Sequence, residues 1–129
     1  MGETLRLAAF GGVYSNHLAL RAVLDDIAAV APDVTWCLGD LGGFGPAPDR
    51  SAEILRASGV SMLRGNYDDS IGHDRSDCAC GYTDPRDERF AQLSYDYTVA
   101  RTDAAHKAWM RDLPEQARHP CAQIGRAHV

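Results

Sequence analysis

Two short segments of this sequence contain side chains that could hold a divalent cation. Asp40 follows Gly39 directly after one apolar run, and Asn66 follows Gly65 directly after the next. Carboxylate and amide oxygens are hard ligands that suit such cations, and paired cations can clamp a phosphoryl group and generate hydroxide from water. Because that chemistry needs more than two side chains, the sequence predicts Asp40 and Asn66 as one part of a larger metal site.

Both residues are predicted to lie at the carboxyl ends of strands. The apolar runs Leu5–Phe10, Val34–Leu38 and Val60–Leu63 are typical of short strands, and segments with helical periodicity separate them. This alternation indicates βαβ units and therefore an α/β fold with a mainly parallel sheet and flanking helices. Since ligands bind beyond the carboxyl ends of strands in such sheets, the loops that follow the three strands are expected to converge on one site.

Apolar residues at helical spacing predict helices around these strands. Asn16 is the expected N-cap of the first helix, and Gly59 is the expected end of the second, which begins near Asp49. The polar stretch Ser70–Pro85 is expected to be a loop. The residues expected on the apolar faces are Leu20, Val23, Leu24 and Ile27, then Ala52 and Leu55, then Phe90, Leu93, Ser94 and Tyr97, and finally Ala105, Trp109 and Leu113.

The composition is that of one ordinary globular domain. The chain has 129 residues, of which 45% are hydrophobic and 24% are charged. A net charge of -5 argues against binding to a nucleic-acid backbone, which clustered Lys and Arg would drive. No stretch approaches the roughly 20 apolar residues of a membrane span, and the N-terminus lacks the pattern of a signal peptide. We therefore expect a cytoplasmic protein without nucleic-acid or membrane partners, and the sequence leaves its oligomeric state open.

The cysteines are expected to be reduced, because disulfides are rare in the cytoplasm. None of Cys37, Cys78, Cys80 and Cys121 belongs to a CxxC pair with zinc-ribbon spacing. Cys78 and Cys80 are close enough to take part in metal or redox chemistry, but two thiols in one loop do not complete a metal site. We favour a structural loop at this position.

The order of these segments resembles the calcineurin-like metallophosphoesterases over roughly the first seventy residues. That family has Asp-x-His after its first strand, Gly-Asp after its second and Gly-Asn-His-Asp after its third. Here CLGDLGGFGP, which contains Asp40, is similar to the second pattern, and GNYD, which begins at Gly65, is similar to the third. The resemblance implies a metal-dependent hydrolase of phosphate mono- or diesters, with a phosphorylated small molecule or other phosphoester as its substrate.

The resemblance also implies a role for each residue of these patterns. Asp40 is expected to bridge two divalent ions, such as Mn, Fe or Zn, and Asn66 is expected to bind the second ion. Tyr67 and Asp68 are the candidate catalytic residues, with Asp68 as the acidic group that orients the motif. Tyr67 replaces the family's His, and a tyrosine with a reference pKa of about 10 can donate a hydrogen bond but is a poor general acid near neutral pH.

The first pattern of the family is altered in this sequence. Gly12 and Tyr14 stand where the resemblance implies the Asp and the His that hold the first metal, so this metal site is degenerate. His17 lies nearby, but about one helical turn from the ligand position, which favours a helix-terminus or surface role. Because GGVYSN and GNYD occur together, the replacements resemble a coordinated change.

Three functions remain open from the sequence. The first is a phosphoesterase with a degenerate first metal site. The second is a non-catalytic member of the same superfamily that binds a phosphate group or a nucleotide. In the third, Asp40 and Asn66 only cap loops of a structural domain, as these residue types commonly do.

The family's remaining histidine ligands belong to later motifs that this sequence lacks. Residues 1–122 are therefore expected to be the N-terminal part of a metallophosphoesterase-like domain with little activity of its own, and a sheet that is open to aggregation along an uncovered edge and face. Residues 123–129, QIGRAHV, can be back-translated into a widely used sequencing adapter, and we predict that they are a non-native tail. His119 and His128 do not follow an apolar strand and are not expected to be ligands.

Overall fold

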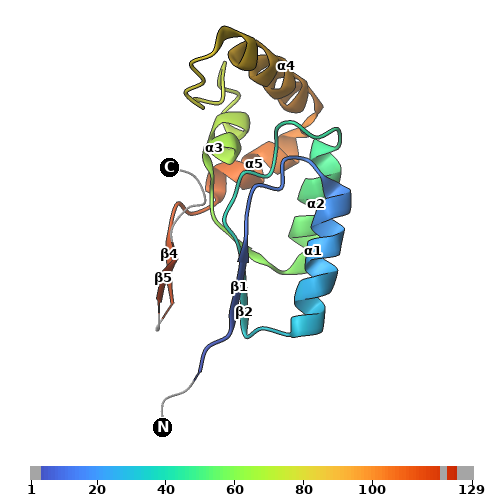
Figure 1. The fold of residues 1–129 in the computed structure, drawn as a ribbon, viewed down its shortest axis with the longest axis vertical. Coiled ribbons are helices and arrows are strands. Elements are labelled where there is room, and N and C mark those ends of the chain that lie inside the picture. The colour runs from blue at the N-terminus through green and yellow to red at the C-terminus, as the bar shows by residue number, and fades with distance from the viewer. Residues whose placement is uncertain (1–3, 120–121, 125–129) are drawn as a thin grey trace.

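The computed structural model describes residues 4–119 and 122–124 and has the α/β architecture that the sequence predicts (Figure 1). Its main sheet contains three parallel strands in the order β1-β2-β3, with Phe10 opposite Cys37 and Cys37 opposite Met62. The carboxyl ends of all three strands therefore lie at the same edge of the sheet. The strands are β1 (Leu7–Phe10), β2 (Val34–Cys37) and β3 (Ser61–Met62), each shorter than the apolar run that predicted it.

Helices connect and flank these strands. The first two helices lie side by side on one side of the sheet, and α3 packs against α5 (Figure 1). A short antiparallel hairpin, formed by β4 (Ala117–His119) and β5 (Ala122–Ile124), lies apart from the main sheet. The helices are α1 (His17–Val30), α2 (Pro48–Ser58), α3 (Asn66–Gly72), α4 (Pro85–Arg101) and α5 (Ala104–Asp112). None of the helices in the described ranges has the length and apolar character of a membrane span.

The predicted ends of the first two helices are confirmed. The Asn16 side chain accepts a hydrogen bond from the amide of Ala19 at 3.0 Å, which satisfies a free donor of the first turn of α1. Gly59 follows α2 with a φ of 74°, a left-handed conformation that glycine adopts without steric cost. Along the chain, α1 thus connects β1 to β2, and α2 connects β2 to β3.

The segment after β3 differs from the prediction, because Asn66 begins α3 and does not lie in a loop. The Asp68 carboxylate accepts a hydrogen bond from the amide of Gly65 at 2.9 Å, so the motif caps its own first turn. The side chains of this helix are therefore held in a fixed orientation relative to the end of β3.

The predicted buried face of α4 is wrong. Phe90 and Leu93 are 54% and 56% exposed, and Tyr97 is also exposed. The helix instead buries a face with smaller or hydrogen-bonding side chains, namely Ala91, Tyr95 and Thr98. Tyr95 donates a hydrogen bond from its hydroxyl to the carbonyl of Arg75 at 2.8 Å, which fixes this face toward the loop that precedes the helix.

The last helix is rotated relative to the prediction. Leu113 is buried as expected, but Ala105 is exposed and Trp109 is only half-buried. His106 and Met110 are the buried residues of α5. The His106 imidazole lies 3.1 Å from a guanidinium nitrogen of Arg56, and this contact ties α5 to α2.

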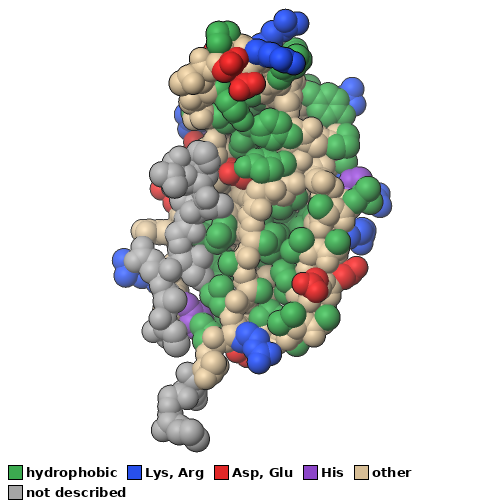
Figure 2. Space-filling view, in the orientation of Figure 1, with side chains coloured by type: hydrophobic (Ala, Val, Ile, Leu, Met, Phe, Trp, Pro, Cys, Tyr) green, Lys and Arg blue, Asp and Glu red, His purple; other side chains and the backbone are tan. Residues whose placement is uncertain are grey.

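The core lies between the sheet and the helices. Cys37, Leu41, Leu63, Ile71 and Met110 are fully buried. By contrast, none of the residues of β1 is fully buried, and hydrophobic side chains gather on the visible face of the molecule beside the sheet (Figure 2). This is the partly uncovered sheet that the sequence predicts.

The predicted tail falls partly on residues that the structure describes. Gln123 and Ile124 belong to β5, whose backbone pairs with β4. The rest of the tail, His128 included, lies outside the described residues, as does Cys121. The origin of residues 123–129 therefore stays a prediction.

Candidate metal and phosphate site

The loops that follow the first two strands are joined by backbone hydrogen bonds. The amide of Gly12 donates to the carbonyl of Gly39 at 3.0 Å, and the amide of Tyr14 donates to the carbonyl of Asp40 at 3.1 Å. The peptide groups thus continue the strand pairing beyond the end of the sheet. As a result, Gly12, Tyr14 and Asp40 lie on adjacent, hydrogen-bonded segments at the carboxyl ends of β1 and β2, as the sequence predicts for these loops.

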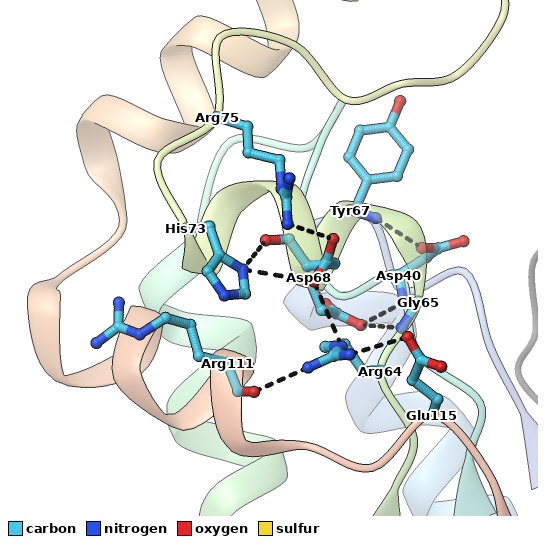
Figure 3. A network of polar contacts seen from close by, with 10 residues as sticks. Asp40, Arg64, Gly65, Tyr67, Asp68, His73, Arg75, Arg111 and Glu115 are labelled. Atoms are coloured by element: carbon cyan, nitrogen blue, oxygen red, sulfur yellow. Dashed lines mark hydrogen bonds and ion pairs between the residues drawn. The ribbon is translucent and has the colours of Figure 1, made fainter.

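Asp68 joins the loop after β2 to the loop after β3 (Figure 3). Its Oδ2 accepts hydrogen bonds from the amides of Asp40 and Gly65, each at 2.9 Å, and its Oδ1 accepts one from the amide of Leu41 at 3.0 Å. The side chain is fully buried, and burial raises the pKa of Asp68 to about 6, although the three amides favour its ionised form. Asp68 has the geometry of a residue that positions the two loops.

The Asp40 side chain lies against the start of α3. Its Oδ1 accepts a hydrogen bond from the amide of Tyr67 at 3.2 Å, and the residue is only 2% exposed. A methyl group on Gly65 would collide with the same oxygen, so the close approach requires glycine. Asp40 itself has a φ of 58°, which is uncommon for a residue with a side chain and is tolerated best by Asn and Asp. The carboxylate therefore contacts backbone on both sides of Asn66.

Asn66 has one buried polar atom without a partner among the described residues. Its Nδ2 donates a hydrogen bond to the carbonyl of Cys78 at 3.2 Å and contacts Sγ of Cys80 at 3.7 Å. Its Oδ1 is buried and accepts no hydrogen bond. Because buried polar atoms are normally satisfied, an unpartnered buried amide oxygen suits a hard cation.

Two oxygen donors do not make a complete metal site. Within residues 4–119 and 122–124, the structure contains no group of three or more His, Cys, Asp or Glu side chains that could hold a metal ion. The donor types at Asp40 and Asn66 thus fit a divalent cation, while the described residues supply too few ligands to bind it tightly.

Gly12 and Tyr14 lie in close contact in the loop after β1. Gly12 has a φ of 67°, and a Cβ atom at this position would lie 2.9 Å from Cε2 of the Tyr14 ring. The Tyr14 ring therefore occupies the space that a side chain at position 12 would need. An aspartate at position 12 therefore requires the Tyr14 ring to move.

A side chain introduced at Gly12 alone is expected to destabilise the protein. Gly12→Asp should lower the free energy of unfolding by about 1–3 kcal/mol, because it combines a positive φ with a steric clash. Adding Tyr14→His should recover part of this loss, since the smaller ring leaves room for the carboxylate. Urea denaturation of the wild type, both single variants and the double variant gives the coupling energy. Strictly additive effects of the two substitutions would contradict a steric conflict between a side chain at position 12 and the Tyr14 ring.

Aromatic side chains from the loops after β1 and β2 and from the first turn of α3 pack together. Tyr14, Phe44 and Tyr67 contact one another edge to face, with ring centroids 5.3 to 5.8 Å apart. The Tyr67 ring extends away from the hydrogen bonds around Asp68 (Figure 3), and burial raises the pKa of Tyr67 above its usual value. The Tyr67 hydroxyl thus stays protonated at neutral pH. Phe44, which the sequence analysis did not single out, completes this cluster.

The cysteines differ from the prediction in one respect. Cys78 and Cys80 form a disulfide, so the expectation that all cysteines are reduced is wrong for this pair. Cys37 is a free, buried thiol. The CAC spacing was the available signal, but a sequence cannot show that the loop turns so that both sulfur atoms meet.

His17, the first residue of α1, is half-buried and lines a surface cavity with Tyr14 and Phe44.

Comparison with known proteins confirms the resemblance to the metallophosphoesterases. The structure of a metallophosphoesterase from Sphaerobacter thermophilus is 26% identical and superimposes with a TM-score of 0.64, which covers 91% of this chain and 44% of that one. A hypothetical protein from Pyrococcus horikoshii is 22% identical, with a TM-score of 0.67 over 88% of this chain and 50% of that one. The chain thus has a metallophosphoesterase-like fold and spans about half the length of these structures.

Sequence comparison gives a shorter match. An uncharacterised protein from Methanocaldococcus jannaschii is 36% identical over 62 residues, which are 48% of this chain and 26% of that protein. No family model matches the chain. The fold is therefore the firmest link to the phosphoesterases.

Proposed function

We propose that this chain is part of a metal-dependent phosphoesterase with a degenerate first metal site, and that its substrates are phosphate mono- or diesters. Asp40 and Asn66 are the metal ligands that this chain supplies, and the other ligands come from residues outside its described part. The observation that supports this proposal most strongly is the buried, unpartnered Oδ1 of Asn66 next to backbone that contacts the Asp40 carboxylate. The metallophosphoesterase-like fold supports it independently.

The side chains of this site divide the work. Asp40 and Asn66 supply oxygen donors, and Asp68 holds the two loops in register through three backbone amides. A divalent cation bound there would act as a Lewis acid on the phosphoryl group and lower the pKa of a bound water molecule. Tyr67, with its protonated hydroxyl, can donate a hydrogen bond to a phosphoryl oxygen but does not supply a proton.

Tyr67→Phe tests this division of roles by pH dependence. Because the pKa of Tyr67 is raised, its hydroxyl is neutral throughout the range in which phosphoesterases are usually assayed. The variant of the full-length protein should therefore lose about tenfold in kcat/KM through one missing hydrogen bond, while the shape of its pH profile stays that of the wild type. Loss of one limb of the profile would show that Tyr67 transfers a proton.

The proposed function is tested by metal analysis and activity of the full-length protein. We expect bound divalent metal and turnover of 4-nitrophenyl phosphate or bis(4-nitrophenyl) phosphate in the wild type. Asp40→Asn keeps an oxygen that can accept the hydrogen bond from Tyr67 but removes the charge, so it should lose metal and activity without unfolding. Asp25→Asn, which changes an exposed carboxylate of α1, should leave both unchanged. Turnover that survives Asp40→Asn would remove Asp40 from the mechanism.

The small number of ligands among the described residues favours one alternative, a non-catalytic member that binds a phosphate group or a nucleotide. In that case the aromatic cluster of Tyr14, Phe44 and Tyr67 fills the space of a metal ligand permanently. Saturable binding of inorganic phosphate or a nucleotide, without metal and without turnover, would favour this alternative over the phosphoesterase.

A further inference from the structure

The disulfide between Cys78 and Cys80 contributes little as a structural crosslink. It lies in the loop between α3 and α4 and joins two residues that a single alanine separates, with their Cα atoms 5.3 Å apart. A crosslink stabilises a fold mainly by restricting the unfolded chain, and this effect is smallest for the shortest loops. The bridge is therefore expected to add little to the stability of the fold.

The two cysteines differ in exposure. Cys78 is 6% exposed, whereas Cys80 is partly exposed and follows the exposed Ala79. Both cysteines line a surface cavity of about 200 Å³ together with Tyr82 and Gln92. Because Cys80 is the more exposed of the two, we expect a small thiol to attack it rather than Cys78.

The same loop holds the Asn66 side chain. Both contacts of Asn66 Nδ2 end on the bridged segment, at the Cys78 carbonyl and at the Cys80 sulfur. The carbonyl that accepts this hydrogen bond belongs to one of the two bridged residues. A change in the bonding of these sulfur atoms would therefore act on Asn66, whose Oδ1 is buried and unpartnered among the described residues.

We propose that Cys78 and Cys80 form a thiol–disulfide exchange site, and that its oxidised form holds the Asn66 side chain in place. A dithiol reductant attacks Cys80 Sγ as a thiolate, the Cys78–Cys80 bond breaks, and Cys78 leaves as a thiolate that takes up a proton. The second thiol of the reductant then displaces Cys80 from the mixed disulfide. Two electrons pass to the protein, which gains two thiols, and the reductant leaves as a cyclic disulfide.

Release of Asn66 on reduction is expected to weaken cation binding at the site, and this consequence alone rests on the proposed function. The exchange reaction and the contact with Asn66 do not depend on it. They are therefore tested by readouts that need neither metal nor phosphoesterase activity.

The exchange reaction is tested by equilibrating the protein with mixtures of reduced and oxidised dithiothreitol and glutathione, quenching with acid, and counting alkylated cysteines by peptide mass spectrometry. We expect Cys78 and Cys80 to change together and reversibly with the buffer. Cys37 is an internal control, because burial raises the pKa of its thiol to about 12 and keeps it unreactive in the folded chain. Alkylation of Cys78 and Cys80 in every buffer, or in none, would overturn the proposal.

The point of attack is tested with two matched variants. Cys78→Ser leaves Cys80 as the thiol of this loop, and Cys80→Ser leaves Cys78. The thiol in Cys78→Ser should react with 5,5′-dithiobis(2-nitrobenzoate) at least about tenfold faster than the thiol in Cys80→Ser, because Cys80 is the more exposed of the two cysteines. Equal rates would contradict attack at Cys80.

The contact with Asn66 is tested by the NMR signals of its side-chain amide, assigned through their loss in Asn66→Asp. These signals should shift between the oxidised and reduced protein and should be insensitive to reductant in the double variant Cys78→Ser/Cys80→Ser. Unchanged signals in the wild type would overturn the coupling. If Mn²⁺ fails to bind in either redox state, the proposed function fails, while the alkylation and amide signals still decide this inference.

Discussion

Asp68→Asn is expected to remove most of the stability of the domain. The wild-type carboxylate accepts hydrogen bonds from the amides of Asp40, Leu41 and Gly65 while fully buried. Asparagine offers one acceptor oxygen and turns an NH₂ group toward at least one of these donors, so buried polar groups lose their partners. We expect the free energy of unfolding, measured by urea denaturation, to fall by about 3–5 kcal/mol.

Asp69→Asn is the matched control for this prediction. Asp69 is the next residue of α3, and its carboxylate pairs with the side chains of Arg64 and Arg75 at 3.5 and 3.2 Å while about a third exposed. Partly exposed ion pairs of this kind contribute little, so Asp69→Asn should cost about 1 kcal/mol or less. If the two substitutions had equal effects, Asp68 would not be the residue that joins the loops.

Gly65→Ala is expected to disrupt the site more directly. The backbone at Gly65 has an ordinary φ of -84°, so alanine meets no conformational penalty there. Its methyl group would, however, collide with Asp40 Oδ1 and approach the Asp40 amide to 2.7 Å. The loops after β2 and β3 must then separate. In the full-length protein we expect at least about a hundredfold loss of metal affinity, together with a loss of about 2–4 kcal/mol in unfolding free energy.

Gly59→Ala separates this steric effect from the general cost of replacing a glycine. Gly59 has a φ of 74°, and no atom lies within 4 Å of a Cβ atom built on it. The substitution should cost about 1 kcal/mol through its backbone conformation and leave metal affinity unchanged. Metal affinity in Gly65→Ala equal to that of Gly59→Ala would contradict the close contact between Gly65 and Asp40.

Much of the fold could be predicted because its signals are local. The apolar runs before Gly11, Gly39 and Gly65 become the ends of the three strands, and Asn16 and Gly59 supply standard helix boundaries. The order of these elements determined the parallel sheet, and with it the edge at which the loops meet. The comparison with solved structures confirms the resemblance that the Gly-Asp and Gly-Asn patterns indicate.

Helix orientation could not be predicted in the same way. In α4, apolar residues repeat at helical spacing, but Phe90 and Leu93 are exposed while Thr98 is buried. The helix is oriented by contacts with distant segments: the Ser94 hydroxyl accepts a hydrogen bond from the amide of Phe44 at 2.6 Å, and the Tyr97 hydroxyl donates one to the carbonyl of Pro46 at 3.0 Å. Such contacts depend on tertiary structure, which periodicity does not contain.

The candidate site was predicted in part. The sequence indicated which residues are near one another, but it did not indicate that Asp68 is fully buried among three amides or that Tyr14 occupies the space above Gly12. Nor did it show that Asn66 contacts the loop of Cys78 and Cys80, because that contact depends on how α3 and the following loop turn. The metal-binding roles of Asp40 and Asn66 and the catalytic roles of Tyr67 and Asp68 remain predictions.

We expect the loop after β2 and the first residue of α3 to present Asp40 and Asn66 to one cation. The most direct test is a crystal structure of the full-length protein with Mn²⁺, in which anomalous scattering locates the ion. We expect a peak about 2.2 Å from both a carboxylate oxygen of Asp40 and Oδ1 of Asn66. An ion bound elsewhere, or a peak that contacts only one of the two residues, would contradict it.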